Sequence, residues 1–422
     1  MNLDWARLKA VVLESDDWGL CAWVPDEQAF RVLVDTPAWR GAAGRIYGRS
    51  TLESAGDVER LASTLLEFRG GDGFPPVWQA NTIMAAPDYE RLVPPSFEIE
   101  ELPLVPLPET PRRWRRPGMW DQVGRAMDAG VWWPELHGLH HAPVAAWLRA
   151  LRRGTADARR AHEQECMVCE AVQAGSEYDP SEPLAVRTRN IEHAIERFQA
   201  LFGRLPGSLC PPDYRWDETL EQDAERLGVT TIQGKTEQES QWPAPLRRLL
   251  HRARWPDLRA RRFYLPPRIA FEPRGGVAPA GGLGAIPVHQ ATRVAWGRGQ
   301  PAIVSTHRVN YAHLDSAWSE AGRAALRDLL GRLAGDAAVF LTDAEVRSLV
   351  ESGWSVRSIG DRGALLRFYG VPREPVRFAA PERVSRAVVC EGQTGVARIE
   401  VESGWVRAEV NPGEYLLEWR RE

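Results

Sequence analysis

The 422-residue sequence contains almost no lysine and few cysteines. Two of its 53 basic residues are lysines, Lys9 and Lys235, and we attribute this bias to a GC-rich genome rather than to function. The five cysteines are odd in number, and only CMVC (166–169) contains a close pair, which argues against a disulfide framework. We expect CMVC to lie in an amphipathic helix and to have no metal or redox role.

Long hydrophobic runs and a strong net charge are also missing. No segment approaches the length that spans a bilayer, and the apolar run near the N-terminus is too short for a secretory signal. The formal net charge of −4 is small for this length, so we expect no nucleic-acid partner. We therefore expect a cytoplasmic protein that has no transmembrane segment and keeps its cysteines reduced.

The first 350 residues alternate short apolar runs with amphipathic segments, which is typical of repeated β–α units. We expect strands at 9–14, 77–84, 131–136, 207–210, 229–233, 302–306 and 338–341. Helical periodicity predicts a helix over 186–202, and the capping-box sequence TDAE (342–345) predicts the start of another. This pattern indicates an α/β fold with a mostly parallel sheet.

The pattern changes at Trp354. From there on, apolar and polar residues alternate with a period of two, and turn residues separate the runs. We therefore predict two domains, an α/β domain over 1–353 and a small antiparallel β domain over 354–422. We consider the second domain as a surface for homo-oligomer formation.

Polar residues that suit metal binding or proton transfer follow several predicted strands. In open or barrel-like parallel α/β folds, ligands bind at the carboxyl ends of the strands. The residues in such positions are Asp16, Asp17, His137, His140, His141, Asp213 and His307. Because they follow four different strands, we expect one site at this edge of the sheet.

The adjacent aspartates Asp16 and Asp17 are costly at the end of a buried strand, because like charges resist joint ionisation. A divalent cation would stabilise both as anions. His137 and His141 are four residues apart, so their rings would project from one face of a helical turn, whereas His140 would point elsewhere. Two imidazoles and one carboxylate form a common open metal site. We expect one divalent metal ion, Zn²⁺ in the first place, with Co²⁺, Ni²⁺ or Mn²⁺ as alternatives.

Four segments resemble, in order, the motif series of the polysaccharide deacetylase family (carbohydrate esterase family 4): ESDDWG (14–19), HGLHHAP (137–143), PPDY (211–214) and STHRVNY (305–311). The resemblance covers residues 9–350 and is that of a divergent branch. It implies a distorted (β/α)7-type barrel with mostly parallel strands.

Carried over to this sequence, the resemblance implies that Asp16 is the general base and His307 the general acid. It also implies that Asp17, His137 and His141 bind the metal. The implied reaction removes an acetyl group, N-acetyl in the first place, from a sugar or glycan intermediate. A metal-bound water would be the nucleophile.

The third motif departs from the family pattern, which has an arginine and then a proline followed by an aromatic residue. In SLCPPDY, Cys210 stands near the place of the arginine and Asp213 near that of the aromatic residue. The arginine orients the base in the family. Arg215 and Arg308 are our candidates to replace it.

The substrate site is expected to include side chains close to the motifs. These are Trp18, Asn81, Asp213, Tyr214, Arg308 and Asn310. Two alternative functions stay open, a catalytically inactive carbohydrate-binding protein on the same fold and a glycosidase on a related barrel. A glycosidase needs two carboxyl groups that flank a glycosidic bond, and adjacent aspartates with two histidines fit a metal better.

Overall fold

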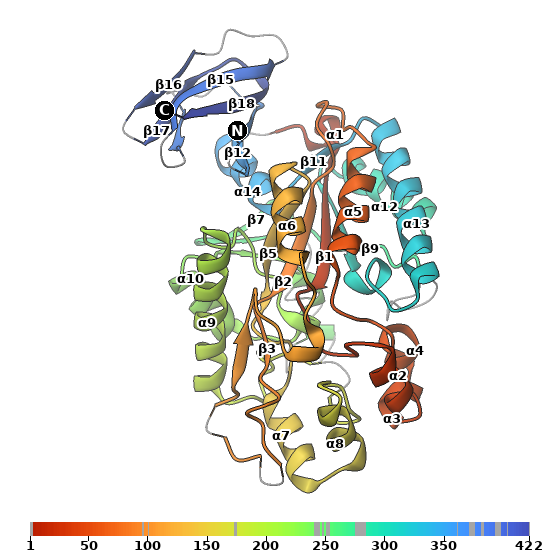
Figure 1. Ribbon diagram of the computed structural model, residues 1–422. Coiled ribbons are helices and arrows are strands. Elements are labelled where there is room, and N and C mark those ends of the chain that lie inside the picture. The colour runs from red at the N-terminus through yellow and green to blue at the C-terminus, as the bar shows by residue number, and fades with distance from the viewer. Residues whose placement is uncertain are drawn as a thin grey trace.

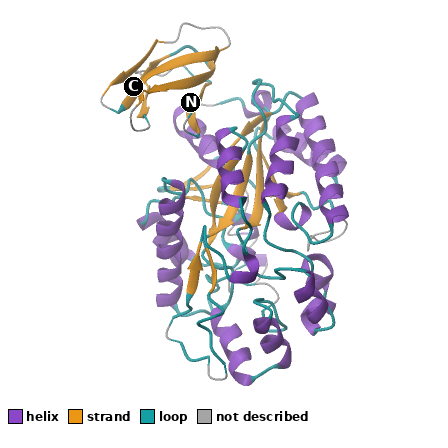
Figure 2. Cartoon of the chain, viewed as in Figure 1, coloured by secondary structure: helices purple, strands orange, loops and turns teal. Residues whose placement is uncertain are grey.

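The computed structural model shows an α/β fold followed by a group of antiparallel strands (Figure 1, Figure 2). It describes residues 3–94, 97–99, 101–172, 175–239, 245–246, 249, 254–274, 284–360, 362–370, 376–380, 384–392, 398–402 and 404–421. Within these residues, no helix is both long and apolar enough to cross a membrane.

The central sheet is parallel, and β1 (Ala10–Trp18) lies in its middle. One side of β1 pairs with β10 (Ala302–His307). The other side pairs first with β11 (Val339–Leu341) and then with β2 (Trp78–Ile83). The outer strands are β5 (Trp132–Gly138), next to β2, and β9 (Arg268–Ala270), next to β10. The predicted α/β fold with a mostly parallel sheet is therefore confirmed.

Single bridges extend the parallel pairing beyond β5. Leu209 bridges β5 on one side and β6 (Thr231–Ile232) on the other, so the strand predicted over 207–210 is reduced to one bridging residue. Beyond β6 lies β8 (Arg262–Tyr264), which also pairs with the antiparallel β7 (Asp257–Arg259). No strand pairing among the described residues joins β8 to β9, so closure into a (β/α)7-type barrel stays a prediction.

Helices pack on both faces of the sheet, and a short hairpin of β3 (Ala85–Pro87) and β4 (Leu104–Pro106) extends beyond it (Figure 1). The helices are α1 (Trp5–Leu8), α2 (Glu27–Leu33), α3 (Pro37–Arg40), α4 (Ala42–Tyr47), α5 (Ala55–Leu66), α6 (Met119–Asp128), α7 (Val144–Arg153), α8 (Ala156–Glu163), α9 (Leu184–Phe202), α10 (Glu218–Arg226), α12 (Ala285–Gly297), α13 (Ser316–Gly335) and α14 (Asp343–Ser352). The predicted capping box at Thr342 opens α14, and a second one at Ser54 opens α5.

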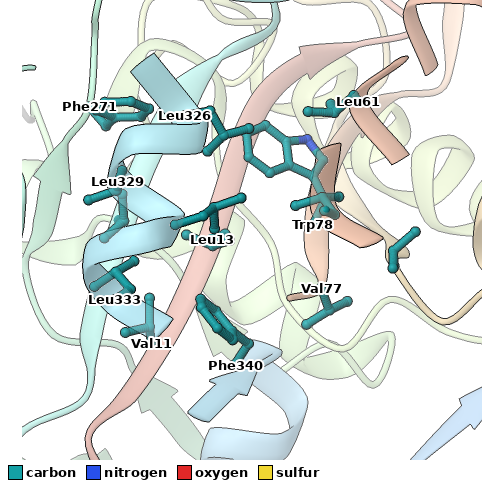
Figure 3. Packing of buried hydrophobic residues seen from close by; sticks show 14 of the residues in the cluster. Val11, Leu13, Leu61, Val77, Trp78, Phe271, Leu326, Leu329, Leu333 and Phe340 are labelled. Atoms are coloured by element: carbon teal, nitrogen blue, oxygen red, sulfur yellow. The ribbon is translucent and has the colours of Figure 1, made fainter. Parts of the chain in front are cut away.

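The main core lies between the sheet and the helices α5 and α13 (Figure 3). Val11 and Leu13 of β1 are almost fully buried, and Leu326 and Leu329 of α13 cover them. Each such side chain contributes about 1.5–3 kcal/mol relative to an exposed position. This packing fixes β1 and therefore the position of the residues at its carboxyl end.

The chain closes with antiparallel strands, as predicted. They are β12 (Trp354–Ile359), β13 (Gly363–Phe368), β14 (Val376–Ala379), β15 (Val384–Gly392), β16 (Arg398–Glu402), β17 (Trp405–Glu409) and β18 (Gly413–Arg421). The buried guanidinium of Arg367 on β13 contacts Asp72 and Glu345 of the α/β part. The division at residues 353 and 354 into two domains and a homo-oligomer through the second stay predictions.

Two local predictions were wrong. β1 was expected to end at residue 14, but it continues to Trp18, so both aspartates belong to the strand. CMVC was expected in a helix, but α8 ends at Glu163, and Cys166 and Cys169 lie buried in the segment that follows. The apolar residues of this segment are buried in the core although the segment is not helical. Their apolar pattern therefore reflects burial and not helical periodicity.

Candidate functional site

The last residues of β1 direct two carboxylates into one site. Successive side chains of a regular strand point to opposite faces of the sheet. Asp17, however, has φ 74°, and the register with β2 shifts between Ser15 and Trp18. This irregularity lets the carboxylates of both Asp16 and Asp17 approach His137 at the end of β5.

Three of the expected ligands converge. Oδ1 of Asp17 lies 3.5 Å from Nε2 of His137 and 3.6 Å from Nε2 of His141. These distances are long for hydrogen bonds. They match the separation of about 3.3–3.6 Å between ligand atoms bound about 2.0–2.2 Å from one tetrahedral cation. The three residues therefore fit a single divalent metal ion.

Backbone geometry, not a helical turn, brings the two histidines together. His137 is part of β5, and His141 follows a loop in which its own φ is 55°. Oε1 of the buried Glu177 accepts hydrogen bonds from the N–H groups of Leu139 (2.6 Å) and His140 (3.3 Å). A Cβ on Gly138, which has φ 145°, would lie 2.5 Å from that oxygen. Glu177 and Gly138 thus shape the loop between the ligands, and the predicted helical turn is not formed.

His137 is oriented from its far side. Its Nδ1 lies 2.8 Å from the carbonyl oxygen of Cys210, so Nδ1 carries a proton, and Nε2 is the nitrogen that faces Asp17. Burial alone would lower the pKa of His137, but the charges of Asp16 and Asp17 raise it above its ordinary value. A ligand histidine is commonly held in this way.

Asp16 is held by Arg268, which the sequence analysis did not select. Nη1 and Nη2 of Arg268 each donate to one oxygen of Asp16 at 2.8 Å, and Asn81 donates to Oδ1 at 2.6 Å. Burial alone would raise the pKa of Asp16, but the charge of Arg268, followed by that of His137, lowers it well below its ordinary value. Asp16 is therefore ionised at neutral pH.

The two arginines that we considered for this role lie elsewhere. Arg215 forms an ion pair with Asp179, and Arg308 is buried against Glu53 and the carbonyl oxygen of Leu20. Neither Arg215 nor Arg308 therefore replaces the arginine of the third motif, and both candidates were wrong. Arg268 begins β9, next to β10, and reaches Asp16 from across β10, where sequence spacing gives no guide.

The buried side chain of Glu14 also contacts Arg268. Oε2 of Glu14 lies 2.6 Å from Nε of Arg268, in a close ion contact that is not aligned as a hydrogen bond. Burial, followed by the charge of Asp343, raises the pKa of Glu14 well above its ordinary value. Arg268 thus contacts two acidic side chains of β1, Asp16 through Nη1 and Nη2 and Glu14 through Nε.

Replacing Arg268 by methionine is expected to lower the free energy of unfolding by about 3–5 kcal/mol, because Glu14 and Asp16 lose a buried partner. Arg215→Met is the matched control and should cost less than about 1 kcal/mol, because the Arg215 side chain is 46% exposed. Urea denaturation of both variants measures the difference. Equal, small losses would show that Arg268 is not the partner that these carboxylates need.

His307, the last residue of β10, lies next to Asp16 in the sheet register. Its Nε2 is 3.9 Å from Oδ2 of Asp16, and its Nδ1 is 2.6 Å from Oε1 of Glu272. Asn310 donates to the other oxygen of Glu272 at 2.7 Å. Burial alone would lower the pKa of His307, but the charge and hydrogen bond of Glu272 raise it to about 10. His307 is therefore a protonated imidazolium that can donate a proton from Nε2.

The remaining residues that we expected to contact substrate are partly in place. The ring of Trp18 is 1% exposed and packs edge-on against Trp132, so it lies in the core and does not face the site. Tyr214 accepts a hydrogen bond at its hydroxyl from Arg268 (2.7 Å). Asp213 is exposed, and its φ of 54° places it in the left-handed region, directly before Tyr214. Tyr214 and Asp213 therefore border the site.

Sequence reasoning missed three residues of the site, Arg268, Glu272 and Glu177. Arg268 begins β9 and Glu272 follows it, in a short segment that lacks the apolar pattern of the other strands. The only available signal was their spacing of four residues around a short strand. No sequence motif indicates that the carboxylate of Glu177 accepts hydrogen bonds from the backbone N–H groups of the loop between His137 and His141.

Neither a known family model nor a curated protein matches the sequence. Among solved structures, the chain is similar to a proposed polysaccharide deacetylase from Mycobacterium smegmatis (12% identity, 81% of this chain and 90% of that chain, TM-score 0.41). It is also similar to a 4-α-glucanotransferase from Thermococcus litoralis (11%, 80% and 40%, 0.41) and to the carbohydrate deacetylase Agd3 (12%, 97% and 65%, 0.38). These likenesses are distant.

Proposed function

We propose that this protein is a metal-dependent hydrolase that removes an acetyl group, in the first place an N-acetyl group, from a sugar or glycan intermediate. One observation carries the proposal. Asp17, His137 and His141 share the spacing of ligands to one cation, while Asp16 and the imidazolium of His307 lie beside them at 3.9 Å from each other. A metal group, a proton acceptor and a proton donor are the parts that acetyl hydrolysis needs.

The metal would be held by Oδ1 of Asp17 and by Nε2 of His137 and of His141, with Zn²⁺ the best match to two imidazoles and one carboxylate. A bound divalent cation would lower the pKa of a coordinated water and polarise the acetyl carbonyl group. Cys210 stays outside this group, because its thiol lies with Asp16 and His137 rather than with Asp17 and His141, and its carbonyl oxygen orients His137.

Proton transfer would use the two groups on the other side. Oδ2 of Asp16 accepts one hydrogen bond from Arg268 and faces His307, so it can accept a proton from the attacking water. His307 would donate the proton at Nε2 to the departing amine, while Glu272 holds Nδ1. Arg268 and Asn81 donate hydrogen bonds to Asp16, and these bonds would hold its carboxylate in position during both proton transfers.

Glu272→Gln is expected to move the basic limb of the pH–rate profile to lower pH. The acid must be protonated, so activity falls as the pH rises through the pKa of His307, which Glu272 raises to about 10. Loss of this carboxylate lowers that pKa, while the amide still occupies the space. Profiles of kcat/KM for wild type and variant, with metal content measured alongside, test the shift. A basic limb that does not move would show that Glu272 has no influence on the acid.

Product analysis tests the proposed function. Zinc-loaded protein is incubated with acetylated mono- and oligosaccharides, and both free acetate and new reducing ends are measured. Acetate that disappears after chelation and returns with zinc supports the deacetylase. New reducing ends without acetate would indicate a glycosidase. Tight sugar binding without either product would indicate an inactive carbohydrate-binding protein.

A further inference from the structure

Tyr47 is the last residue of α4, in the long connection between β1 and α5. Figure 1 shows α2, α3 and α4 grouped beyond the end of the sheet at which β1 finishes. This connection contains none of the four motif segments beyond Gly19. It nevertheless places one aromatic side chain against the proton donor of the site.

The ring of Tyr47 is held in a chain of aromatic contacts. It lies edge-on to the imidazole of His307, with ring centroids 6.2 Å apart and planes at 83°. Its other neighbour is Trp23, stacked at 5.9 Å and 17°, which in turn packs edge-on against Trp39 at 5.3 Å. Nε1 of Trp39 donates to the carbonyl oxygen of Gly48 (2.9 Å), directly after Tyr47. The position of Tyr47 is therefore fixed before any substrate binds.

Tyr47 lies close enough to the acidic groups of the site to feel their charges, which come from Asp16 and Asp17 on β1 and from Glu272 after β9. Burial, followed by the charges of Glu272, Asp17 and Asp16, raises the pKa of Tyr47 well above its ordinary value. The phenol is thus neutral and carries a proton that it can donate. No hydrogen bond of this hydroxyl is formed within the part of the chain that the structure describes, and the side chain is half-buried. A donor positioned in this way is available to a bound molecule.

We propose that Tyr47 is a substrate-binding residue that donates a hydrogen bond to the sugar on the leaving-group side of the scissile bond. This inference rests on the proposed function, because His307 defines that side. The metal-binding residues mark where the acetyl group lies, and His307 marks where the departing nitrogen lies. Tyr47 contacts His307, so a molecule that spans the site presents its sugar ring to Tyr47.

The test compares a sugar substrate with one that has no sugar. Tyr47→Phe keeps the ring and its packing and removes only the hydroxyl group. We expect the ratio of kcat/KM for N,N′-diacetylchitobiose to that for 4-nitrophenyl acetate to fall by about tenfold, with most of the change in KM. Tyr89→Phe is the matched control, because its buried hydroxyl lies in the same aromatic cluster and its ring contacts Trp147 and His162 rather than His307. Its ratio should stay within twofold of wild type.

The outcomes separate this inference from the proposed function. If wild type releases acetate and Tyr47→Phe lowers kcat/KM for both substrates equally, the inference is overturned and the proposed function stands. If wild type releases no acetate, the proposed function fails, and calorimetric titration with N,N′-diacetylchitobiose decides. Binding that is weaker in Tyr47→Phe than in wild type supports the inference. Equal binding, or no binding by wild type, overturns it.

Discussion

His137→Ala protein, loaded with zinc and then dialysed, is expected to retain less than about a tenth of an equivalent of metal, where wild type retains about one. The variant loses one of the three proposed ligands, the imidazole that the carbonyl oxygen of Cys210 orients toward Asp17. Asp17 then shares a cation with His141 alone, and two ligands hold zinc poorly. Elemental analysis of both proteins, prepared identically, measures the retained metal.

His140→Phe is the matched control for this experiment. His140 lies in the same loop and is 1% exposed, but it is not part of the convergent group. Burial lowers the pKa of His140, so its imidazole is neutral, and phenylalanine keeps a neutral planar ring at this position. We expect His140→Phe to retain about one equivalent. Metal retained by His137→Ala, or none retained by wild type, would refute the assigned metal site.

His307→Gln is expected to lower kcat by about 10²–10⁴ and to leave metal retention near one equivalent. Glutamine can occupy the position beside Glu272, but it cannot donate a proton to a leaving amine. The loss should be smaller for 4-nitrophenyl acetate, because the nitrophenolate departs without a proton. Steady-state kinetics with both substrates, together with elemental analysis, measures these effects.

The control for His307→Gln is His313→Gln. His313 follows in the same segment and stacks on Trp318, and it has no contact with Asp16 or Glu272 among the described residues. Its kcat should stay within about twofold of wild type, as for a surface substitution away from the site. If both variants keep full activity, His307 is not the acid, and the proposed route for the proton is wrong.

The fold was predictable where hydrophobic burial sets the pattern. β1, β2, β5 and β10 contain continuous buried runs, and each was expected within a few residues of its bounds. β9 was missed, since it has three residues and begins with an arginine. β6 and the bridge at Leu209 are shorter than predicted, because irregular pairing there replaces full strands.

The sequence by itself determined which chemical groups stand at the ends of the strands. Asp16, Asp17, His137, His141 and His307 were selected because parallel strands share one carboxyl edge. The adjacent aspartates and the two nearby histidines also predicted the kind of chemistry, which is metal binding combined with proton transfer. These inferences need only residue type, spacing and strand direction.

Only the tertiary structure decided which partners hold these groups. Arg268 reaches Asp16 from 252 positions away in the chain, and Glu272 reaches His307 from 35 positions away. The left-handed backbone of Asp17 and His141 turns their side chains toward each other, where a regular strand or helix would not. Contacts of this kind depend on how distant segments pack and on local backbone torsions, and neither leaves a periodic signal in the sequence.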